Sequence, residues 1–356
     1  MNFNAPLVRS LRILLFPFSL VYGLAVCVRN YLFDHNILKS SSFNLPIICV
    51  GNLSAGGTGK SPMVEFLIRL LKNRWHVAVL SRGYKRKTKG YALAQENTTA
   101  LEIGDEPMLF HIKFPDVAIA VGEERIVAIP QLLHDRPKTG AIILDDAFQH
   151  RWVKAGFNIL LSDYNNLFTR DWFLPTGDLR DEKRSYRRAD VIIVSKCPPT
   201  LPEQEAEFLR KEINPLPHQR VFFTSIQYGI PYHIVTRRPM PLQAAMEVLL
   251  VTGIANPAPL KNYLQEAVAA YYEMAFSDHH IFTIDDWKEI KKRYQGIAAE
   301  KKIILTTEKD AVRLTKFAQE LQEYPVYVLP IDIQFLFNQE QAFSDLITKF
   351  IQDFNH

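Results

Sequence analysis

A glycine-rich segment, CVGNLSAGGTGKSP from Cys49 to Pro62, lies between a short apolar stretch and an amphipathic pattern. The stretch Ile47–Val50 predicts a buried strand, and the positions after the loop predict a helix. The apolar face of that helix consists of Val64, Leu67, Ile68 and Leu71. Strand, glycine loop and helix in this order are typical of a phosphate-binding loop, whose backbone N–H groups and helix N-terminus attract an anion. The chain is therefore expected to bind a nucleotide.

The loop also supplies a cation and a metal ligand. Lys60 offers an ammonium group to the phosphates, the Ser61 hydroxyl can ligate Mg²⁺, and Pro62 fits the first turn of a helix. At one position the loop departs from G-x-x-x-x-G-K-[ST], because Ser54 stands where the first glycine would be. A glycine-rich surface turn is the simpler alternative. The expected nucleotide contacts are Ser54, Ala55, Gly56, Gly57, Thr58, Gly59, Lys60 and Ser61.

A second segment, AIILDDAFQHR, supports the first. It is an apolar strand that ends in Asp145 and Asp146, where a carboxylate can hold Mg²⁺ directly or through water. Apolar strands that end in acids are common, but one that follows a phosphate loop indicates an Mg-nucleotide enzyme. ATP and Mg²⁺ are the expected ligands.

Short apolar stretches recur between helical patterns, which indicates an α/β fold. We expect a mostly parallel sheet like that of P-loop NTPases, flanked by helices, with a smaller second α/β domain and an N-terminal membrane-associating helix. The C-terminal apolar positions, from Phe343 to Phe354 at helical spacing, predict a helix that packs on the core. The expected boundaries are 1–35 for the N-terminal helix, 36–225 for the kinase core, 226–240 for a linker, 241–325 for the smaller domain and 326–356 for a returning strand and helix. The expected strands are Ile47–Val50, Val77–Leu80, Val117–Val121, Ala141–Leu144, Ile159–Leu161, Val191–Val194, Val221–Thr224, Val248–Val251, Ile303–Leu305 and Val326–Leu329.

Composition excludes several classes of protein. Hydrophobic residues make up 47% of the 356 residues, which is enough for a buried core, so disorder is not expected. Cys27, Cys49 and Cys197 are far apart and lack metal-ligand spacing, which favours a reducing compartment over a disulfide framework or a zinc site. The net charge of +4 is too small to indicate nucleic acid, and the basic run has few interleaved aromatic residues. We expect no nucleic-acid partner.

An uncharged run, Ile13–Val28, lies near the amino terminus. As a helix it would be about 24 Å long, which is shorter than the roughly 30 Å hydrocarbon core of a bilayer. We interpret it as an anchor that lies in the membrane plane, bent early by Pro17. Its expected headgroup contacts are Arg9, Arg12 and Arg29, and its expected acyl contacts are Phe16, Phe18, Leu20 and Tyr22. A buried core helix and a signal peptide are the alternatives.

Phosphoryl transfer to an alcohol requires a base near the acceptor hydroxyl and cations for the spread negative charge. The GDEP segment places Asp105 and Glu106 before an apolar helix, so one carboxylate can accept a proton while the other binds metal. A plain helix start with Asp105 as N-cap is the alternative. The SDHHIF segment offers His279 and His280, which loop histidines can also explain.

The SRGYKRKTK segment follows a predicted strand and so falls at the carboxyl edge of the sheet, where ligands bind in open α/β folds. A solvated run of charges is the alternative. The expected acceptor contacts here are Ser81, Arg82, Gly83 and Tyr84.

Eight segments in order, GNLSAGGTGKSP, LSRGYKR, GDEP, ILDDAFQHR, LPTGDLR, VTGIANP, DHH and TEKDAVRL, resemble the tetraacyldisaccharide 4′-kinase family, the lipid A 4′-kinases of Gram-negative bacteria. The resemblance extends to about Leu314. It implies ATP- and Mg²⁺-dependent transfer of the γ-phosphoryl group to the 4′-hydroxyl of an acylated glucosamine disaccharide 1-phosphate. It also implies a peripheral or monotopic enzyme on the cytoplasmic face of the inner membrane. We expect a monomer, and the resemblance accounts for Ser54, since the family carries a hydroxyl residue there.

The resemblance also assigns roles to residues. It implies that Asp105 is the base, Glu106 lies near the metal with Ser61 and Asp145, and His279 assists the base from the smaller domain. Lys60, Asp145 and Asp146 complete the expected catalytic set. The expected substrate contacts further along the chain are Arg125, Gln149, His150 and Arg180. After Arg180 the sequence departs from the family, because Asp181, Glu182 and Lys183 replace a common Arg-Glu-Pro, and the TEKD segment has no assigned contact.

The main alternative is a P-loop kinase or NTPase that acts on another small or lipid substrate. A GTP switch is not favoured, because no Asn-Lys-x-Asp occurs in a suitable place and TEKD is not that motif. A nonenzymatic nucleotide sensor at a membrane is the weakest of the open alternatives.

Overall fold

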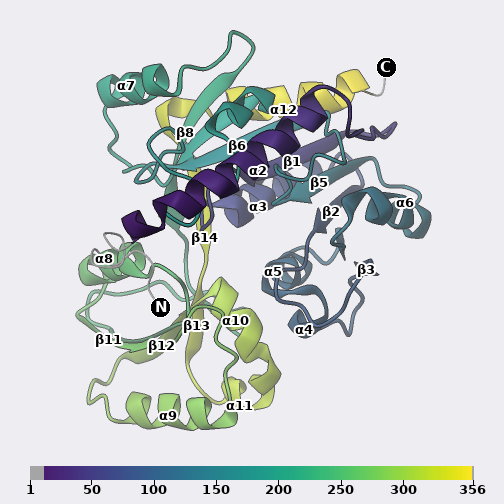
Figure 1. Cartoon of the computed structure of the whole chain (residues 1–356). Coiled ribbons are helices and arrows are strands. Elements are labelled where there is room, and N and C mark those ends of the chain that lie inside the picture. The colour runs from purple at the N-terminus through teal and green to yellow at the C-terminus, as the bar shows by residue number, and fades with distance from the viewer. Residues whose placement is uncertain (1–11, 355–356) are drawn as a thin grey trace. The chain divides into compact units, whose positions relative to one another are not determined.

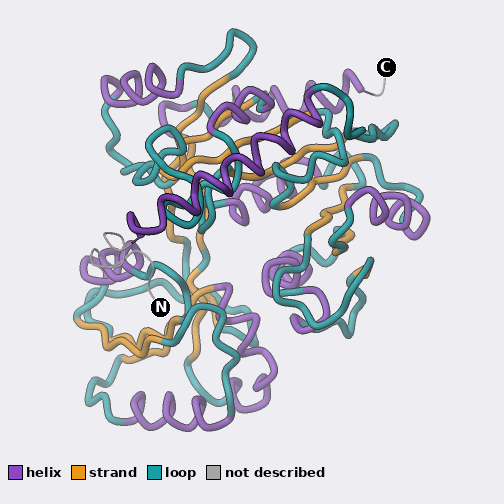
Figure 2. Tube along the Cα trace, viewed as in Figure 1, coloured by secondary structure: helices purple, strands orange, loops and turns teal. Residues whose placement is uncertain are grey.

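Two units, each with its own sheet, make up the computed structural model, which describes residues 12–354 (Figure 1). One unit runs up to Ile226 and resumes at Ile333, and the other is Gln227–Asp332. In each unit the strands lie inside and most helices lie outside them (Figure 2). The α/β fold class is confirmed.

The first unit contains a nine-stranded sheet in the order β14-β8-β7-β6-β1-β5-β2-β4-β3. The central strand β1 pairs in parallel with β5 and β6, and β3 pairs antiparallel with β4. The strands are β1 Ile47–Asn52, β2 Val77–Ser81, β3 Ala92–Leu93, β4 Ala118–Val121, β5 Ala141–Asp145, β6 Phe157–Asp163, β7 Val191–Ser195, β8 Arg220–Tyr228 and β14 Ile331–Phe335.

Helices cover both faces of this sheet. Alternate residues of β1 enter different cores: Ile47 and Cys49 join one, and Ile48 and Val50 join the other. Apolar runs buried on both faces are typical of parallel strands. The helices are α2 Phe16–Asp34, α3 Lys60–Leu71, α4 Ala100–Ile103, α5 Asp105–Lys113, α6 Arg125–Asp135, α7 Glu203–Ile213 and α12 Glu340–Phe354, with 3₁₀ turns at Ile13–Leu15, Lys183–Arg188 and Leu336–Asn338.

The second unit contains a five-stranded sheet in the order β11-β10-β12-β13-β9, in which only β9 pairs antiparallel. Its strands are β9 Tyr232–His233, β10 Glu247–Thr252, β11 Ala270–Ala275, β12 Lys302–Thr307 and β13 Val326–Leu329. Its helices are α8 Ala258–Ala267, α9 Ile284–Gln295, α10 Glu308–Leu314 and α11 Ala318–Gln322, with a 3₁₀ turn at Thr315–Phe317.

Each predicted apolar stretch lies in a strand, except that β4 begins at Ala118 and leaves out the predicted Val117. Helix α12 buries Phe343, Ile347 and Ile351 as the spacing predicted. The expected linker, 226–240, contains β9, which pairs with β13 in the second sheet. The chain returns to the first unit through β14 and α12.

Helix α2 differs from the expected N-terminal helix in length and contacts. Together with the preceding 3₁₀ turn it runs from Ile13 to Asp34 and contains 22 residues. By length and composition alone, a helix of this kind could cross a membrane. Pro17 stands in its first turn, where its missing N–H costs no helical hydrogen bond. The expected headgroup contact Arg12 is wrong, because its guanidinium lies 2.8 Å from the Asp178 carboxylate and is mostly buried.

Three further expectations for the N-terminal helix need correction or lie outside the described residues. Tyr22 does not face outward, since its hydroxyl donates to the Arg180 carbonyl at 3.1 Å. Arg29 donates to the Gln149 carbonyl at 2.7 Å, so its hydrogen bond goes to the protein. Arg9 lies outside the described residues.

Candidate active site at the phosphate loop

The glycine-rich loop connects β1 to α3 at the carboxyl edge of the sheet. Gly59 caps α3 with φ 79°, a left-handed conformation that glycine adopts without strain. A Cβ added at Gly56 or Gly57 would meet nothing within 4 Å. The loop therefore presents its backbone to open space beside a helix N-terminus, as an anion site requires.

Ser54 holds the loop against a neighbouring segment. Its hydroxyl donates to Asp171 at 3.3 Å, and the Ala55 amide donates to the Asp178 carbonyl at 2.6 Å. On the other side of the loop, the Ser195 hydroxyl donates to the Thr58 carbonyl at 2.9 Å. A hydroxyl at position 54 thus has a structural use, and the Ala55 amide already has a protein partner.

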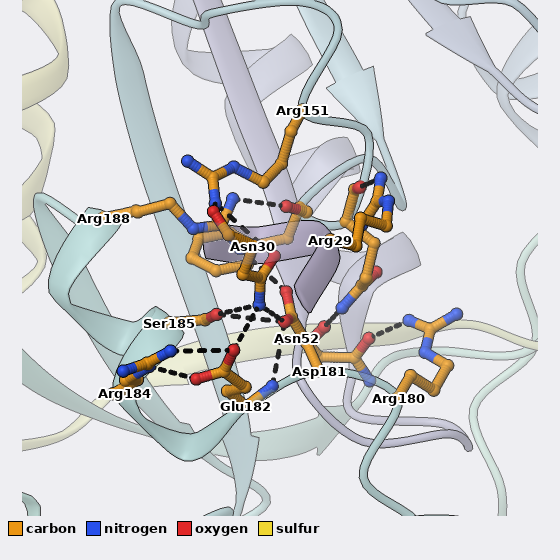
Figure 3. Close-up of polar contacts among 12 residues, drawn as sticks. Arg29, Asn30, Asn52, Arg151, Arg180, Asp181, Glu182, Arg184, Ser185 and Arg188 are labelled. Carbon is orange, nitrogen blue, oxygen red and sulfur yellow. Dashed lines mark hydrogen bonds and ion pairs between the residues drawn. The ribbon is translucent and has the colours of Figure 1, made fainter. Parts of the chain in front are cut away.

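Four polar side chains meet where β1 and β5 end. Lys60 Nζ lies 3.4 Å from Asn52 Oδ1 and 3.6 Å from Asp146 Oδ1. Arg180 donates to the same Asn52 oxygen at 2.5 Å and to Asp146 at 2.8 Å. Figure 3 shows Asn52 and Arg180 facing one another. Two cations thus lie at the loop, where phosphate oxygens would find them.

The two adjacent aspartates have opposite pKa shifts. For Asp146, burial disfavours the charge, but Lys60 and Arg180 outweigh burial and lower its pKa to about 2. For Asp145, burial raises the pKa to about 7, and the negative charges of Glu106 and Asp146 add to the shift. One carboxylate is therefore ionised throughout the physiological range, and the other is poised near neutrality.

Asp145 and Glu106 offer oxygen ligands beside the loop. Asp145 is 1% exposed, its Oδ2 accepts from Ser81 at 3.1 Å, and its Oδ1 is buried with no hydrogen-bond partner in residues 12–354. Ser61 donates to Glu106 at 3.0 Å. Within the described chain no cluster of three His, Cys, Asp or Glu side chains could by itself hold a metal. A cation that binds few protein oxygens together with phosphate and water, as Mg²⁺ does, fits this set.

Asp105 is the first residue of α5, directly after Gly104, which has φ 94° and acts as the N-cap. The alternative in which Asp105 caps the helix is therefore wrong. A Cβ at Gly104 would lie 2.9 Å from the Tyr84 carbonyl, so the GDEP and SRGY segments are in close contact. Arg82 and Tyr84 are exposed and Gly83 is buried with φ 73°, whereas Ser81 binds Asp145 as described.

Three expected substrate residues instead hold backbone groups. Arg125 is 1% exposed and donates to the carbonyls of Gly122 and Asp145 at 2.7 and 3.2 Å, and burial lowers its pKa to about 10. Gln149 donates to the Asn52 carbonyl at 2.5 Å. His150 Nε2 donates to the Glu123 carbonyl at 3.2 Å, and burial, followed by the charge of Arg125, lowers the pKa of this histidine.

His279 belongs to the second unit, where Arg313 contacts it and links it to Asp310 of the unassigned TEKD segment. The Arg313 guanidinium donates to His279 Nδ1 at 3.1 Å and pairs with the fully buried Asp310 at 3.0 Å. Because a guanidinium only donates, Nδ1 must accept, and the ring proton lies on Nε2. Asp310 also accepts from the Gly253 amide at 3.0 Å. The VTG, DHH and TEKD segments therefore form one cluster. His280 instead contacts Asp286 at 2.9 Å.

Three residues that shape the site had no predicted role: Asn52, Asp171 and Ser195. Asn52 ends β1 and Ser195 ends β7, so a polar residue at the carboxyl end of a buried strand was the available signal. Asp171 lies in a loop and had no such signal. Arg313 was part of a noted segment but had no predicted partner.

Comparison with known proteins gives consistent matches. The family model described as tetraacyldisaccharide-1-P 4′-kinase (LpxK) matches residues 11–352. A Bacteroides thetaiotaomicron protein named tetraacyldisaccharide 4′-kinase is 44% identical over 354 residues, covering 95% of this chain and 93% of that protein. A protein of the same name from Flavobacterium johnsoniae is 44% identical, covering 96% and 98%. The crystal structure of "apo" form LpxK from Aquifex aeolicus in complex with ATP superposes with a TM-score of 0.75 at 28% identity, covering 96% of this chain and 99% of that one.

Proposed function

The chain belongs to the tetraacyldisaccharide-1-P 4′-kinase family, and from that premise we propose how its residues perform the reaction. It is an ATP-dependent kinase of lipid A biosynthesis that phosphorylates the 4′-hydroxyl of tetraacyldisaccharide 1-phosphate. The convergence of the two cations Lys60 and Arg180 on both Asn52 and Asp146, beside the glycine loop, is the observation that supports the residue assignments most strongly.

Lys60 and the amides from Gly56 onward bind the ATP phosphates in this proposal. Arg180 lies beside Lys60 and stabilises the negative charge that spreads over the transferred group. Asp146 holds both cations in place through its ion pairs, because its carboxylate is ionised at every physiological pH. Arg125 acts indirectly, by holding the carbonyl of Asp145.

Asp105 accepts the proton of the acceptor hydroxyl. It stands at the start of α5, directly after Gly104, which packs against the Tyr84 carbonyl. The exposed side chains of Arg82 and Tyr84 are available to a sugar. His279 stays a catalytic candidate. Because Arg313 donates to its Nδ1, the other ring nitrogen, Nε2, carries the proton. The partnership between His279 and Asp105 stays a prediction.

Ser61, Glu106 and Asp145 would hold Mg²⁺. The orphaned, buried Oδ1 of Asp145 supports this assignment, as does the hard-oxygen chemistry of all three groups. The cation would neutralise charge on the β- and γ-phosphates. Ser81 orients the Asp145 carboxylate through its hydrogen bond.

We expect Mg²⁺ affinity to depend on pH near neutrality. The cation binds only the ionised carboxylate, so below the Asp145 pKa of about 7 protons compete with it and affinity falls by roughly tenfold per pH unit. Calorimetric titration of the nucleotide-free protein with Mg²⁺ from pH 6 to 8 measures this dependence. Asp145→Asn should remove it and Asp116→Asn, at an exposed site, should keep it. A wild-type affinity that is constant over this range would contradict the assignment.

A location on the cytoplasmic face of the inner membrane is part of the proposal, and helix α2 supports contact with the membrane surface. Its buried positions are small or polar, Ser19, Gly23 and Asn30, together with Phe33. Its exposed face carries large apolar side chains: Ile13, Leu14, Phe18, Leu20, Val21, Leu24, Val28 and Tyr31. This pattern is the reverse of a helix on a water-soluble protein. Because one side packs on the first unit, lipid can surround only the other side, which favours an in-plane position over a span.

The triple variant Leu20→Ser, Leu24→Ser, Val28→Ser should bind anionic vesicles at least about tenfold more weakly than the wild type. Each large apolar side chain contributes on the order of 1 kcal/mol to the free energy of membrane binding. These side chains are 59%, 66% and 50% exposed, so folding should be unaffected. Vesicle sedimentation measures the effect. Ile230→Ser, at a 57% exposed site of the second unit, is the matched control. Unchanged sedimentation of the triple variant would rule out α2 as the anchor.

The direct test of the proposed activity is transfer of label from [γ-³²P]ATP to tetraacyldisaccharide 1-phosphate in mixed micelles. The same assay with the deacylated sugar measures how much the acyl chains contribute. Efficient labelling of the acylated substrate and weak labelling of the deacylated one are expected. Equal rates on both would argue against a lipid kinase.

A further inference from the structure

Helix α2 carries one buried polar side chain whose contacts lead to the active site. Asn30 is 2% exposed. Its amide nitrogen lies 2.7 Å from Asp181 Oδ1, 3.2 Å from Glu182 Oε1 and 3.4 Å from Ser185 Oγ. Its backbone carbonyl accepts from Arg151 at 3.1 Å. These contacts are not needed to anchor the helix in a membrane, because the opposite, apolar face of the helix would contact the lipid.

Asp181 is the acceptor that this asparagine contacts most closely, and it is fully buried. Its Oδ1 also accepts from the Ser185 hydroxyl at 3.0 Å and the Glu182 amide at 2.8 Å, and its Oδ2 pairs with Arg188 at 2.8 Å. A buried carboxylate with every oxygen satisfied has one favoured arrangement, because the loss of any partner leaves charge without compensation. Asp181 and Glu182, which depart from the family pattern after Arg180, are therefore residues that contact Asn30 of α2.

Arg180 directly precedes this buried aspartate. Its carbonyl accepts from Tyr22 of α2 at 3.1 Å, and its amide donates to the Leu53 carbonyl beside the glycine loop at 2.7 Å. The guanidinium then reaches Asn52 and Asp146. The backbone of Arg180 is thus held between α2 and the phosphate loop, and Figure 3 shows Asn30, Asp181 and Arg180 in this arrangement.

The helix also contacts the segment that follows Asp146. Arg29 donates to the Gln149 carbonyl at 2.7 Å, and the Gln149 side chain donates to the Asn52 carbonyl. Arg188 donates to the Phe148 carbonyl at 2.8 Å and lies 4.4 Å from the centre of its ring. Both segments that carry Asp146 and Arg180 are therefore joined to α2.

We propose that Asn30 is a positioning residue: through Asp181 it fixes the segment that places Arg180 at the phosphate loop, so α2 organises the active site as well as contacting lipid. The proposal rests on the kinase function and on Arg180 as a phosphate contact. Removing Asn30 should disturb catalysis even where no membrane is present, because misplacing a charge-stabilising group by about 1 Å can cost about a hundredfold in rate.

The test compares full-length wild type with Asn30→Leu and Tyr22→Phe, with Asn262→Leu on the exposed surface of α8 as the matched control. Turnover of ATP with deacylated disaccharide 1-phosphate, in the absence of vesicles, gives kcat and KM. Hydrogen exchange of the amides of residues 177–188 is followed by mass spectrometry on the same samples. Vesicle sedimentation is measured in parallel.

Asn30→Leu should lower kcat on the soluble sugar roughly tenfold to a hundredfold and speed exchange in 177–188, with sedimentation unchanged. Tyr22→Phe, which loses one hydroxyl, should show the same changes to a smaller degree, and Asn262→Leu should show neither. Unchanged exchange and kcat in both α2 variants would overturn the proposal. Because exchange needs no substrate, it tests the coupling separately. If the wild type fails to phosphorylate tetraacyldisaccharide 1-phosphate in mixed micelles, the proposed function fails, while the exchange result still decides the role of Asn30.

Discussion

Replacing Asp105 with asparagine is expected to lower kcat by about a hundredfold to ten-thousandfold, the range that a general base contributes. The amide keeps the size of the side chain at the start of α5 but cannot take the proton of the sugar hydroxyl. KM for ATP should change little, because Lys60 and the glycine loop bind the nucleotide in the proposal. Steady-state kinetics on tetraacyldisaccharide 1-phosphate, with the thermal midpoint as a check of folding, measure the effect.

The control is Asp116→Asn in the same unit, an exposed aspartate that pairs with Lys72. It should retain wild-type kcat, because its carboxylate lies in the turn before β4 and its ion pair is with Lys72, which is not a site residue. Full turnover by a folded Asp105→Asn variant would remove Asp105 as the base and leave its neighbour Glu106 as the carboxylate to examine.

Lys60→Met should reduce kcat/KM for ATP by about a hundredfold to a thousandfold, the loss typical of a preorganised group that stabilises transition-state charge. That fold-change corresponds to roughly 3–4 kcal/mol. Methionine keeps much of the apolar stem but removes the cation that lies 3.6 Å from Asp146 and 3.4 Å from Asn52. Asp146 would retain only Arg180 as an ion-pair partner, so Arg180 is less available to phosphate and the loss should appear in kcat as well as in KM.

Lys72→Met provides the matched substitution at the other end of α3, where the ammonium pairs with exposed Asp116. Surface pairs of this kind contribute little, so its kinetics should equal those of the wild type. Nucleotide binding by fluorescent ATP analogue separates affinity from turnover. Lys60→Met with unaltered kcat/KM would show that the glycine loop holds phosphate without its lysine.

Much of the fold could be predicted because parallel strands buried on both faces leave continuous apolar runs. Each expected stretch, from Ile47–Val50 to Val326–Leu329, lies in a strand, apart from Val117, which precedes β4. Boundaries were less predictable: β1 runs on to Asn52 and β6 begins at Phe157, since hydrogen bonding to neighbours extends a strand past its apolar letters. The phosphate loop was predictable for a similar reason, because its residues are contiguous and its chemistry is local.

Partners far apart in the chain could not be predicted. Arg125 and Gln149 resemble ligand-binding groups in sequence, yet they hold backbone carbonyls. A long polar side chain at a sheet edge can point to ligand or to protein, and only packing decides which. Arg12 is a similar case, because its partners lie more than 160 residues away.

The α/β class, the phosphate loop and the order of segments typical of the family could be predicted from the amino-acid sequence, because each is encoded in neighbouring residues with a recognisable period or spacing. Three properties became visible only in the folded protein. Helix α2 packs through Asn30, the pKa values of Asp145 and Asp146 are shifted in opposite directions, and Arg313 orients His279. These properties depend on burial and on distances between charges that folding brings together. A carboxylate has one pKa in an extended chain, and its neighbours in space give it another.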